Sequence, residues 1–244
     1  GDVYKRQAIA KHTRENYKPG EKPFVCKYCQ RGFSREKTLF SHMCEQKRRW
    51  QQEKDKGVQM GLQAYLRFYE SSQGGQKKTY GDFVNSQYYN AFVKFGKHII
   101  DIKAINPSAF IDYVFKNNIK LDKFCKDENY QNYLEQHLRI ESWQDAIARS
   151  LQNMEKWADE NGVHLHTYFF AANPNKICSH IVNGRVSPWV IFNCETGVAF
   201  LGKLNAEQLT IIYPYIDPDF WRQHFVKYHQ ETAIVKDALK DSKL

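Results

Sequence analysis

The stretch Phe24–Cys44 reads FVCKYCQRGFSREKTLFSHMC and decides the fold of the N-terminal part of the chain. Two residues separate Cys26 from Cys29, and twelve more precede His42. Two cysteines at this spacing fit one tight turn, and a histidine on a following helix can reach the same metal ion. Such a segment is too small to bury a core, so zinc would supply its folding free energy. We therefore predict that Cys26, Cys29 and His42 bind Zn²⁺.

The apolar residues Phe24, Phe33 and Leu39 stand at fixed places around these ligands. The whole pattern resembles the C2H2 zinc-finger family. That resemblance implies a ββα finger, zinc as the cofactor and nucleic acid as the partner. The preceding Pro19–Pro23, with the sequence PGEKP, resembles the linker that joins tandem fingers.

The fourth ligand departs from the family, which places a second His or Cys three to five residues after the first. Gln46, Lys47 and Arg48 stand there, and Cys44 is the nearest donor. On a regular helix His42 and Cys44 point about 200° apart, so the helix must loosen or end near His42 if both bind one ion. A degenerate C2HC set with Cys44 is one prediction; His12, a water molecule or a partner are the alternatives.

The expected finger helix begins near Arg35. Counted back from His42, the positions at which the family reads bases are Arg35, Lys37, Thr38 and Ser41. Arg at the first of them can donate two hydrogen bonds to guanine in the major groove. The basic run Glu45–Lys56 is expected to continue the helix and to contact phosphates, although a solvent-facing linker explains it equally well. The predicted nucleic-acid contacts are Arg35, Lys37, Thr38, Ser41, Lys47, Arg48 and Arg49.

Positive charge is concentrated at the N-terminal end. Residues 1–60 hold 15 Lys and Arg against 7 Asp and Glu, whereas residues 61–244 hold 21 against 20. A basic segment favours a polyanionic partner, because neutralised phosphates release counterions. We predict a nucleic-acid partner, with DNA favoured over RNA, and a possible protein partner for the rest of the chain.

Composition predicts a folded protein with 42% apolar and 15% aromatic residues. No apolar run approaches the roughly 20 residues of a membrane helix, and no signal peptide is recognisable. Three cysteines cluster at metal spacing and three are scattered, which favours a reducing compartment. The expected protein is soluble, intracellular and cytoplasmic, without a membrane partner.

The predicted fold is mainly α with a small β element, a ββα zinc finger being joined to a helical domain. Helices are expected around Val58–Tyr69, Tyr80–Lys103, Pro107–Phe115, Leu121–Leu138, Ser142–Asn161 and from Asp217 onwards, and a strand around Val163–Ala171. Asn183-Gly184 indicates a hairpin turn. The predicted organisation is an adapter-derived segment at 1–7, a basic linker at 8–22, the finger at 23–46, a charged helical linker at 47–57, and a mostly helical domain at 58–244 with a hairpin near 177–190.

A second resemblance covers the segments Asn85–Phe95 and Ser187–Trp189, which are similar to uncharacterised zinc-finger proteins of marine tailed phages. It implies a viral protein in the host cytoplasm and no particular activity.

Enzyme motifs are missing: the sequence contains no HExxH, GxSxG, Walker-type loop or dinucleotide fingerprint. His164, His166, Cys178 and His180 would form a second metal site only if they lay on adjacent strands. The sequence therefore predicts a binding protein and not an enzyme. Two alternatives stay open, a finger that binds a protein and an unrecognised metal-dependent enzyme acting on nucleic acid.

Overall fold

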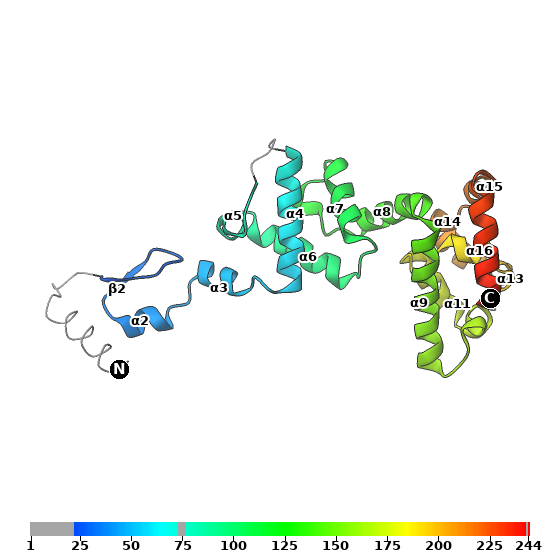
Figure 1. Ribbon diagram of the computed structural model, residues 1–244, viewed down its shortest axis with the longest axis horizontal. Coiled ribbons are helices and arrows are strands. Elements are labelled where there is room, and N and C mark those ends of the chain that lie inside the picture. The colour runs from blue at the N-terminus through cyan, green and yellow to red at the C-terminus, as the bar shows by residue number, and fades with distance from the viewer. Residues whose placement is uncertain (1–21, 73–76, 243) are drawn as a thin grey trace. The chain divides into compact units, whose positions relative to one another are not determined.

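The computed structural model describes residues 22–72, 77–242 and 244, and divides them into two compact units that meet between Ile102 and Lys103 (Figure 1). The division falls inside the predicted 58–244 domain. The adapter-like residues 2–7 and the linker-like Pro19-Gly20 lie outside the described residues. The described part is mainly helical with one small hairpin, as predicted.

The described part of the first unit, from residue 22 on, has a hairpin followed by helices. The two strands pair antiparallel, with Phe24 opposite Phe33. Its described elements are β1 (Phe24–Val25), β2 (Gly32–Phe33), α2 (Glu36–Ser41), α3 (Glu45–Gln51), α4 (Lys56–Ser72), α5 (Tyr80–Asn85) and α6 (Tyr89–Asp101).

Helices α4 and α6 pack against each other closely, because glycines remove the side chains between them. A Cβ on Gly96 would lie 2.2 Å from the Gly57 carbonyl oxygen and 2.3 Å from the Gly61 nitrogen. Beyond this contact, the rings of Tyr65 and Phe92 meet edge to face with centroids 5.6 Å apart. The predicted helix at Val58–Tyr69 is confirmed, and it forms one half of this pair.

The single helix expected at Tyr80–Lys103 is wrong, because the segment forms α5 and α6 with a break at Ser86. Thr79 and Asp82 form a capping box that starts α5. Ser86 has extended backbone angles, and its hydroxyl accepts a hydrogen bond from the Tyr88 N–H. Serine competes for backbone hydrogen bonds in this way and so interrupts a helix.

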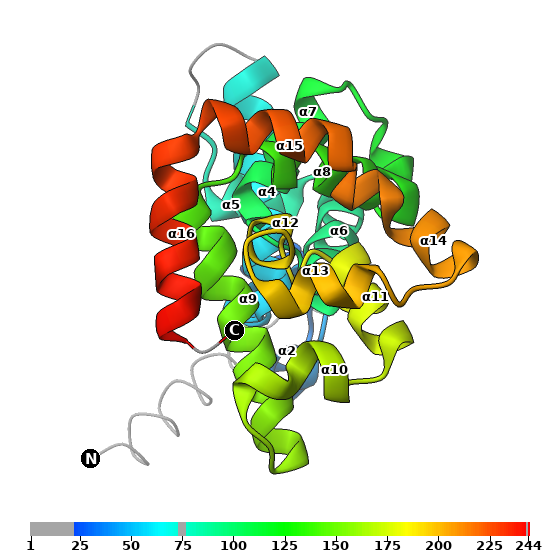
Figure 2. The same ribbon diagram turned by 90° about the vertical axis from the view of Figure 1, so that its right-hand side faces the viewer.

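The second unit is entirely helical in its described residues. The buried four-residue helix α12 contacts α9, α13 and α16 and lies among them in Figure 2. The elements are α7 (Pro107–Lys116), η1 (Leu121–Lys123), α8 (Asp127–Ile140), α9 (Trp143–Asn161), η2 (Leu165–Thr167), α10 (Tyr168–Ala171), α11 (Pro174–Val182), α12 (Pro188–Ile191), α13 (Glu195–Leu201), α14 (Ala206–Ile216), α15 (Pro218–Lys227) and α16 (His229–Asp241).

Capping residues confirm several predicted helices of this unit. Asn106 caps α7 with Pro107 in its first turn, Ser142 caps α9 and Gly162 ends it with φ of 64°, and Asp217 caps α15. The helix expected at Leu121–Leu138 is shorter, because η1 precedes α8. Cap chemistry was therefore the most dependable signal in this part of the sequence.

The strand predicted at Val163–Ala171 and the hairpin predicted near 177–190 are both wrong. Within 163–171, residues 165–171 form η2 and α10, and Asn183-Gly184 ends helix α11. Gly184 has φ of 66°, and its N–H donates to the Ile181 carbonyl at 2.9 Å. Asparagine and glycine with positive φ serve helix ends as readily as hairpin turns. Ile177 and Ile181, four residues apart and both buried, match the helix.

Candidate metal centre

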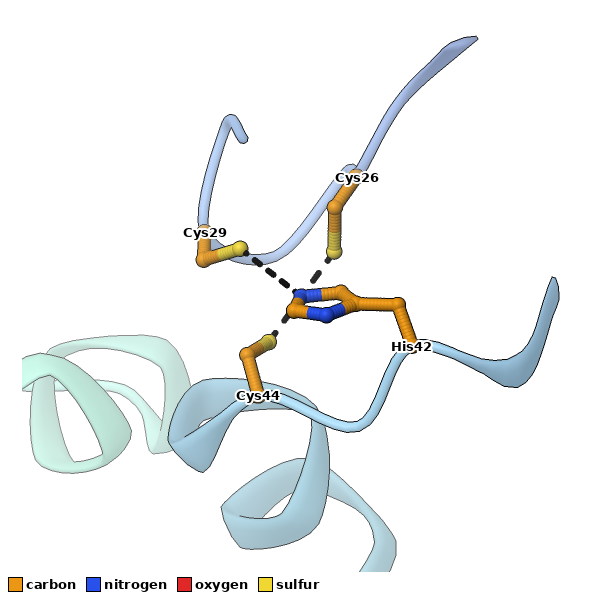
Figure 3. A group of neighbouring side chains, drawn as sticks. All are labelled: Cys26, Cys29, His42 and Cys44. Atoms are coloured by element: carbon orange, nitrogen blue, oxygen red, sulfur yellow. Dashed lines mark hydrogen bonds between the residues drawn. The ribbon is translucent and has the colours of Figure 1, made fainter. Parts of the chain in front are cut away.

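Cys26 and Cys29 lie on the turn that joins the two strands of the hairpin. The Cys26 N–H donates to the Arg31 carbonyl, and the Gln30 N–H donates to the Cys26 carbonyl, both at 2.9 Å. Gln30 has φ of 58°, which closes the turn. The turn holds both thiols on one side of the hairpin (Figure 3), with Cys26 buried and Cys29 half-buried.

His42 and Cys44 flank a break in the chain between two helices. Helix α2 ends at Ser41, and His42 has extended angles of −67° and 124°. Cys44 is also extended and is the N-cap of α3. The expectation that the helix ends near His42 is confirmed. The continuous helix expected through Glu45–Lys56 is wrong, because the break lets both side chains turn towards the hairpin.

The four ligand atoms lie together in a compact group (Figure 3). All are within 4.8 Å of one another. The Cys26 and Cys44 sulfurs are 3.9 Å apart, and the Cys29 sulfur is 3.3 Å from His42 Nε2. With Zn–S bonds of about 2.3 Å and a Zn–N bond of about 2.0 Å, a tetrahedral ion separates two sulfurs by about 3.8 Å and a sulfur from a nitrogen by about 3.5 Å. The group fits a four-coordinate metal ion.

Neighbouring residues hold the two C-terminal ligands in place. The His42 ring packs on Phe33 with centroids 4.7 Å apart. The Lys47 backbone N–H donates to the Cys44 sulfur at 3.3 Å, and its Nζ donates to the His42 carbonyl at 3.2 Å. The first contact places an N–H donor beside the sulfur of Cys44, where it would stabilise the thiolate, the form of cysteine that binds metals.

The thiols influence one another's ionisation. The Cys29 backbone N–H is the main group that lowers the pKa of the Cys26 thiol, from 9.0 to about 7, against the opposing effect of burial. The Arg31 backbone N–H favours the Cys29 thiolate, but burial and the Cys44 and Cys26 thiols outweigh it and raise the pKa of Cys29. A divalent ion removes this conflict, because a coordinated thiol is deprotonated.

Most of the predicted nucleic-acid residues lie on the surface of this part of the chain. The side chains of Arg35, Lys37, Thr38 and Ser41 are exposed along α2, and Arg48 is exposed on α3. Lys47 is half-buried beside the ligands. The Ser41 hydroxyl donates to the carbonyls of Lys37 and Thr38, at 3.1 and 3.3 Å.

Arg49 differs from its neighbours, because its side chain is only 13% exposed. Nη1 donates to the Val84 carbonyl at 2.7 Å, at the end of α5, and the guanidinium lies 4.5 Å from the Tyr89 ring centre and pairs with Glu45. Cations commonly cap free carbonyls at helix ends. Arg49 therefore docks α3 on α5 and is not part of the exposed basic surface. No local sequence signal could have shown this contact, which spans 35 residues.

A second metal site is not formed in the parts of the chain that the structure describes. There, Cys26, Cys29, His42 and Cys44 are the only group of three or more donors close enough for one ion. His164 and His166 stack with centroids 5.6 Å apart, Cys178 is buried on α11, and His180 bonds Tyr168. The adjacent strands that the second site required are helices. The alternative ligand His12 lies outside the described residues.

Comparison with protein-family models, curated proteins and solved structures gives no match. Across 22–72 and 77–242, no helix combines the length and the apolar character that crossing a membrane requires. The functional argument therefore depends on the metal centre and on the residues around it.

Proposed function

We propose that Cys26, Cys29, His42 and Cys44 bind one Zn²⁺, and that the segment it orders binds nucleic acid, DNA in preference to RNA. The observation that carries this proposal is the convergence of four zinc-type donors next to exposed Arg and Lys side chains. We call residues 22–44 the metal module.

Zinc is favoured by the donor chemistry. Thiolates and imidazole suit Zn²⁺, and four protein ligands are typical of a structural site without an open catalytic position. The packing also favours a structural metal ion, because Cys26 is the only buried residue of the metal module. A segment with so little buried surface needs the free energy of metal binding to fold.

Nucleic acid is favoured by the charge that surrounds the site. Residues 22–48 contain seven Lys and Arg against two Glu. Arg35 is exposed at the start of α2, where its guanidinium is free to donate two hydrogen bonds to a guanine. Lys37 and Arg48 add phosphate contacts. Arg49 is left out, because its charge is already used inside the protein.

Zinc content and nucleic-acid binding, measured together, test the proposal. Zinc-loaded protein is titrated into labelled single- and double-stranded DNA and RNA, and fluorescence anisotropy is followed between about 50 and 200 mM salt. We expect one zinc per chain and an affinity that falls steeply with salt. Cys26→Ser should lose the zinc and weaken binding at least about tenfold.

Cys125→Ser is the matched control, since it makes the same chemical change outside the donor group. It should keep both the zinc and the affinity. Zinc-loaded protein that binds no nucleic acid at low salt would overturn the nucleic-acid function and leave a protein partner. Nucleic-acid binding that is unchanged in Cys26→Ser would show that the binding does not depend on the metal module.

A further inference from the structure

Phe40 is the most exposed large apolar side chain among the described residues. Its side chain is 87% exposed on α2, and no ring of the described residues lies against it. Exposing a phenyl ring to water forfeits the free energy that its burial would release. The sequence alone assigns Phe40 no role.

The position of Phe40 on α2 places it on the outward face. Residues three and four apart share a face of a helix, so Phe40 neighbours Lys37, while Leu39 and His42 turn towards the hairpin. Arg35 and Arg48 are also exposed in the same part of the chain. Glu36, four residues before Phe40, is the only acidic residue of α2. The ring is therefore exposed next to Lys37 and Glu36, in a segment that is basic as a whole, with seven Lys and Arg against two Glu in residues 22–48.

This combination fits one kind of nucleic acid better than another. Basic side chains that follow a backbone, with an aromatic ring on which a base stacks, are how proteins bind single strands. Reading a duplex requires several donors and acceptors on one face, but the Ser41 hydroxyl already bonds two carbonyls of its own helix. Helix α2 is also only six residues long and is separated from the basic residues of α3.

We propose that Phe40 stacks on an unpaired base, so that the metal module binds single-stranded DNA in preference to duplex. This inference depends on the proposed nucleic-acid function and specifies its target. Lys37, three residues before Phe40 on α2, neutralises a phosphate next to the stacked base. Because every base has a π-face, stacking of this kind tolerates different sequences.

The test compares three variants of Phe40 in the full zinc-loaded chain. Anisotropy is measured with a labelled single strand of about twelve nucleotides and with the matching duplex. Phe40→Ala should weaken single-strand binding about 5- to 100-fold and change duplex binding little. Phe40→Trp should retain the affinity, whereas Phe40→Leu should lose it, because leucine is apolar but has no ring. The salt dependence should not change, since no charge is removed.

A direct probe and a control complete the design. A 2-aminopurine base in the strand should change its fluorescence on binding to wild type and not to Phe40→Ala. Ile140→Ala, at a site 81% exposed in the second unit, should have no effect, and zinc content should be the same in every variant.

Three results would overturn the stacking proposal. Equal single-strand affinity of wild type and Phe40→Ala would leave the ring to a protein partner, while the nucleic-acid function would stand. Full activity of Phe40→Leu, or a loss confined to the duplex, would indicate an apolar groove contact instead of stacking. Wild type that binds neither single strand nor duplex would instead contradict the proposed function itself.

Discussion

The metal module and helix α7 both contain large apolar residues, yet they use them differently. In residues 22–44 only Cys26 is buried, whereas α7 alone buries Phe110, Ile111 and Val114 to 1% exposure or less. Helix α7 is stabilised by burial of apolar surface. The metal module has no such core, but it brings together four side chains that could hold a metal ion.

This difference explains where the candidate functional residues lie. A segment that a metal ion can order does not need its large side chains inside, and Phe40, Arg35 and Lys37 are all exposed. In the second unit most aromatic rings pack on other rings, as Phe110 does on Tyr130 and Tyr133, each with centroids 5.1 Å apart. The metal module therefore exposes large side chains of a kind that the second unit buries in its core.

Removing the metal should affect the metal module far more than helix α7. Treatment with a strong chelator should abolish amide-exchange protection in residues 24–44 and leave α7 and α9 protected, because only the former depend on metal binding. Structural zinc sites contribute about 10 kcal/mol or more in isolated fingers, so the effect should be all or none. Hydrogen exchange followed by mass spectrometry measures it segment by segment.

The reciprocal control is Phe110→Ala, at a residue with 0% exposure. This change should destabilise the second unit by about 3–5 kcal/mol without lowering zinc content. If the chelator also unprotected α7, or if residues 24–44 stayed protected without metal, the contrast between the two regions would be wrong.

The candidate metal donors could be found from the sequence because their geometry is largely local. The Cys26–Cys29 spacing fixes a turn, and a helix that loosens or ends near His42 is what His42 and Cys44 need if both are to reach one ion; the helix does end there. Helix caps at Asn106, Ser142 and Asp217 were equally local. Elements defined by neighbours within four residues were therefore predicted well.

The failures share a different cause. Asn183-Gly184 satisfies both a hairpin and a helix end, and only the burial of Ile177 and Ile181 decides between them. Arg49 was assigned to phosphate because its partner carbonyl at Val84 is distant in sequence. Phe40 was overlooked because exposure is a property of the whole fold. Packing, and not propensity, settles these cases.

Arg49 and Arg48 are adjacent arginines with opposite environments, so replacing each should affect stability to a different extent. Arg49→Ala removes a charged hydrogen bond to Val84 and a ring contact with Tyr89, so it should destabilise the first unit by about 2 kcal/mol. Arg48→Ala, on the surface, should change stability by less than about 0.5 kcal/mol. Urea unfolding of the zinc-loaded variants measures both.

The same pair should behave in reverse towards nucleic acid. Arg48→Ala should reduce the slope of log affinity against log salt by about one phosphate contact, and Arg49→Ala should leave that slope unchanged. A reduced slope for Arg49→Ala, with no loss of stability, would return Arg49 to the phosphate contacts and contradict its role in docking α3 on α5.

The smallest expected effect is a pH dependence confined to the second unit. His180 Nδ1 lies 2.6 Å from the Tyr168 hydroxyl and 3.0 Å from the Asn153 amide nitrogen. An amide nitrogen can only donate, so this arrangement favours a neutral ring whose Nδ1 accepts. Burial is the main cause that lowers the pKa of His180, with Lys176 and Arg185 adding to it and Glu160 opposing.

The direction of the effect follows from proton binding. An unfolded histidine titrates near pH 6.5, and folded His180 titrates below that value. Between these two pKa values the unfolded chain binds more protons than the folded chain. The contribution of His180 to stability is therefore complete above about pH 6.5 and is lost as the pH falls towards the folded pKa. His137 and His224, whose pKa values burial also lowers, act in the same direction, so the contribution of His180 must be obtained as a difference.

Comparison of wild type with His180→Gln isolates that difference. Amide exchange in α11 should become faster for wild type as the pH falls below 6.5, after correction for intrinsic rates, and the variant should show a flatter dependence. Exposed His164→Gln is the control and should follow wild type. A variant as pH-dependent as wild type would show that the pKa of His180 is the same in the folded and unfolded states.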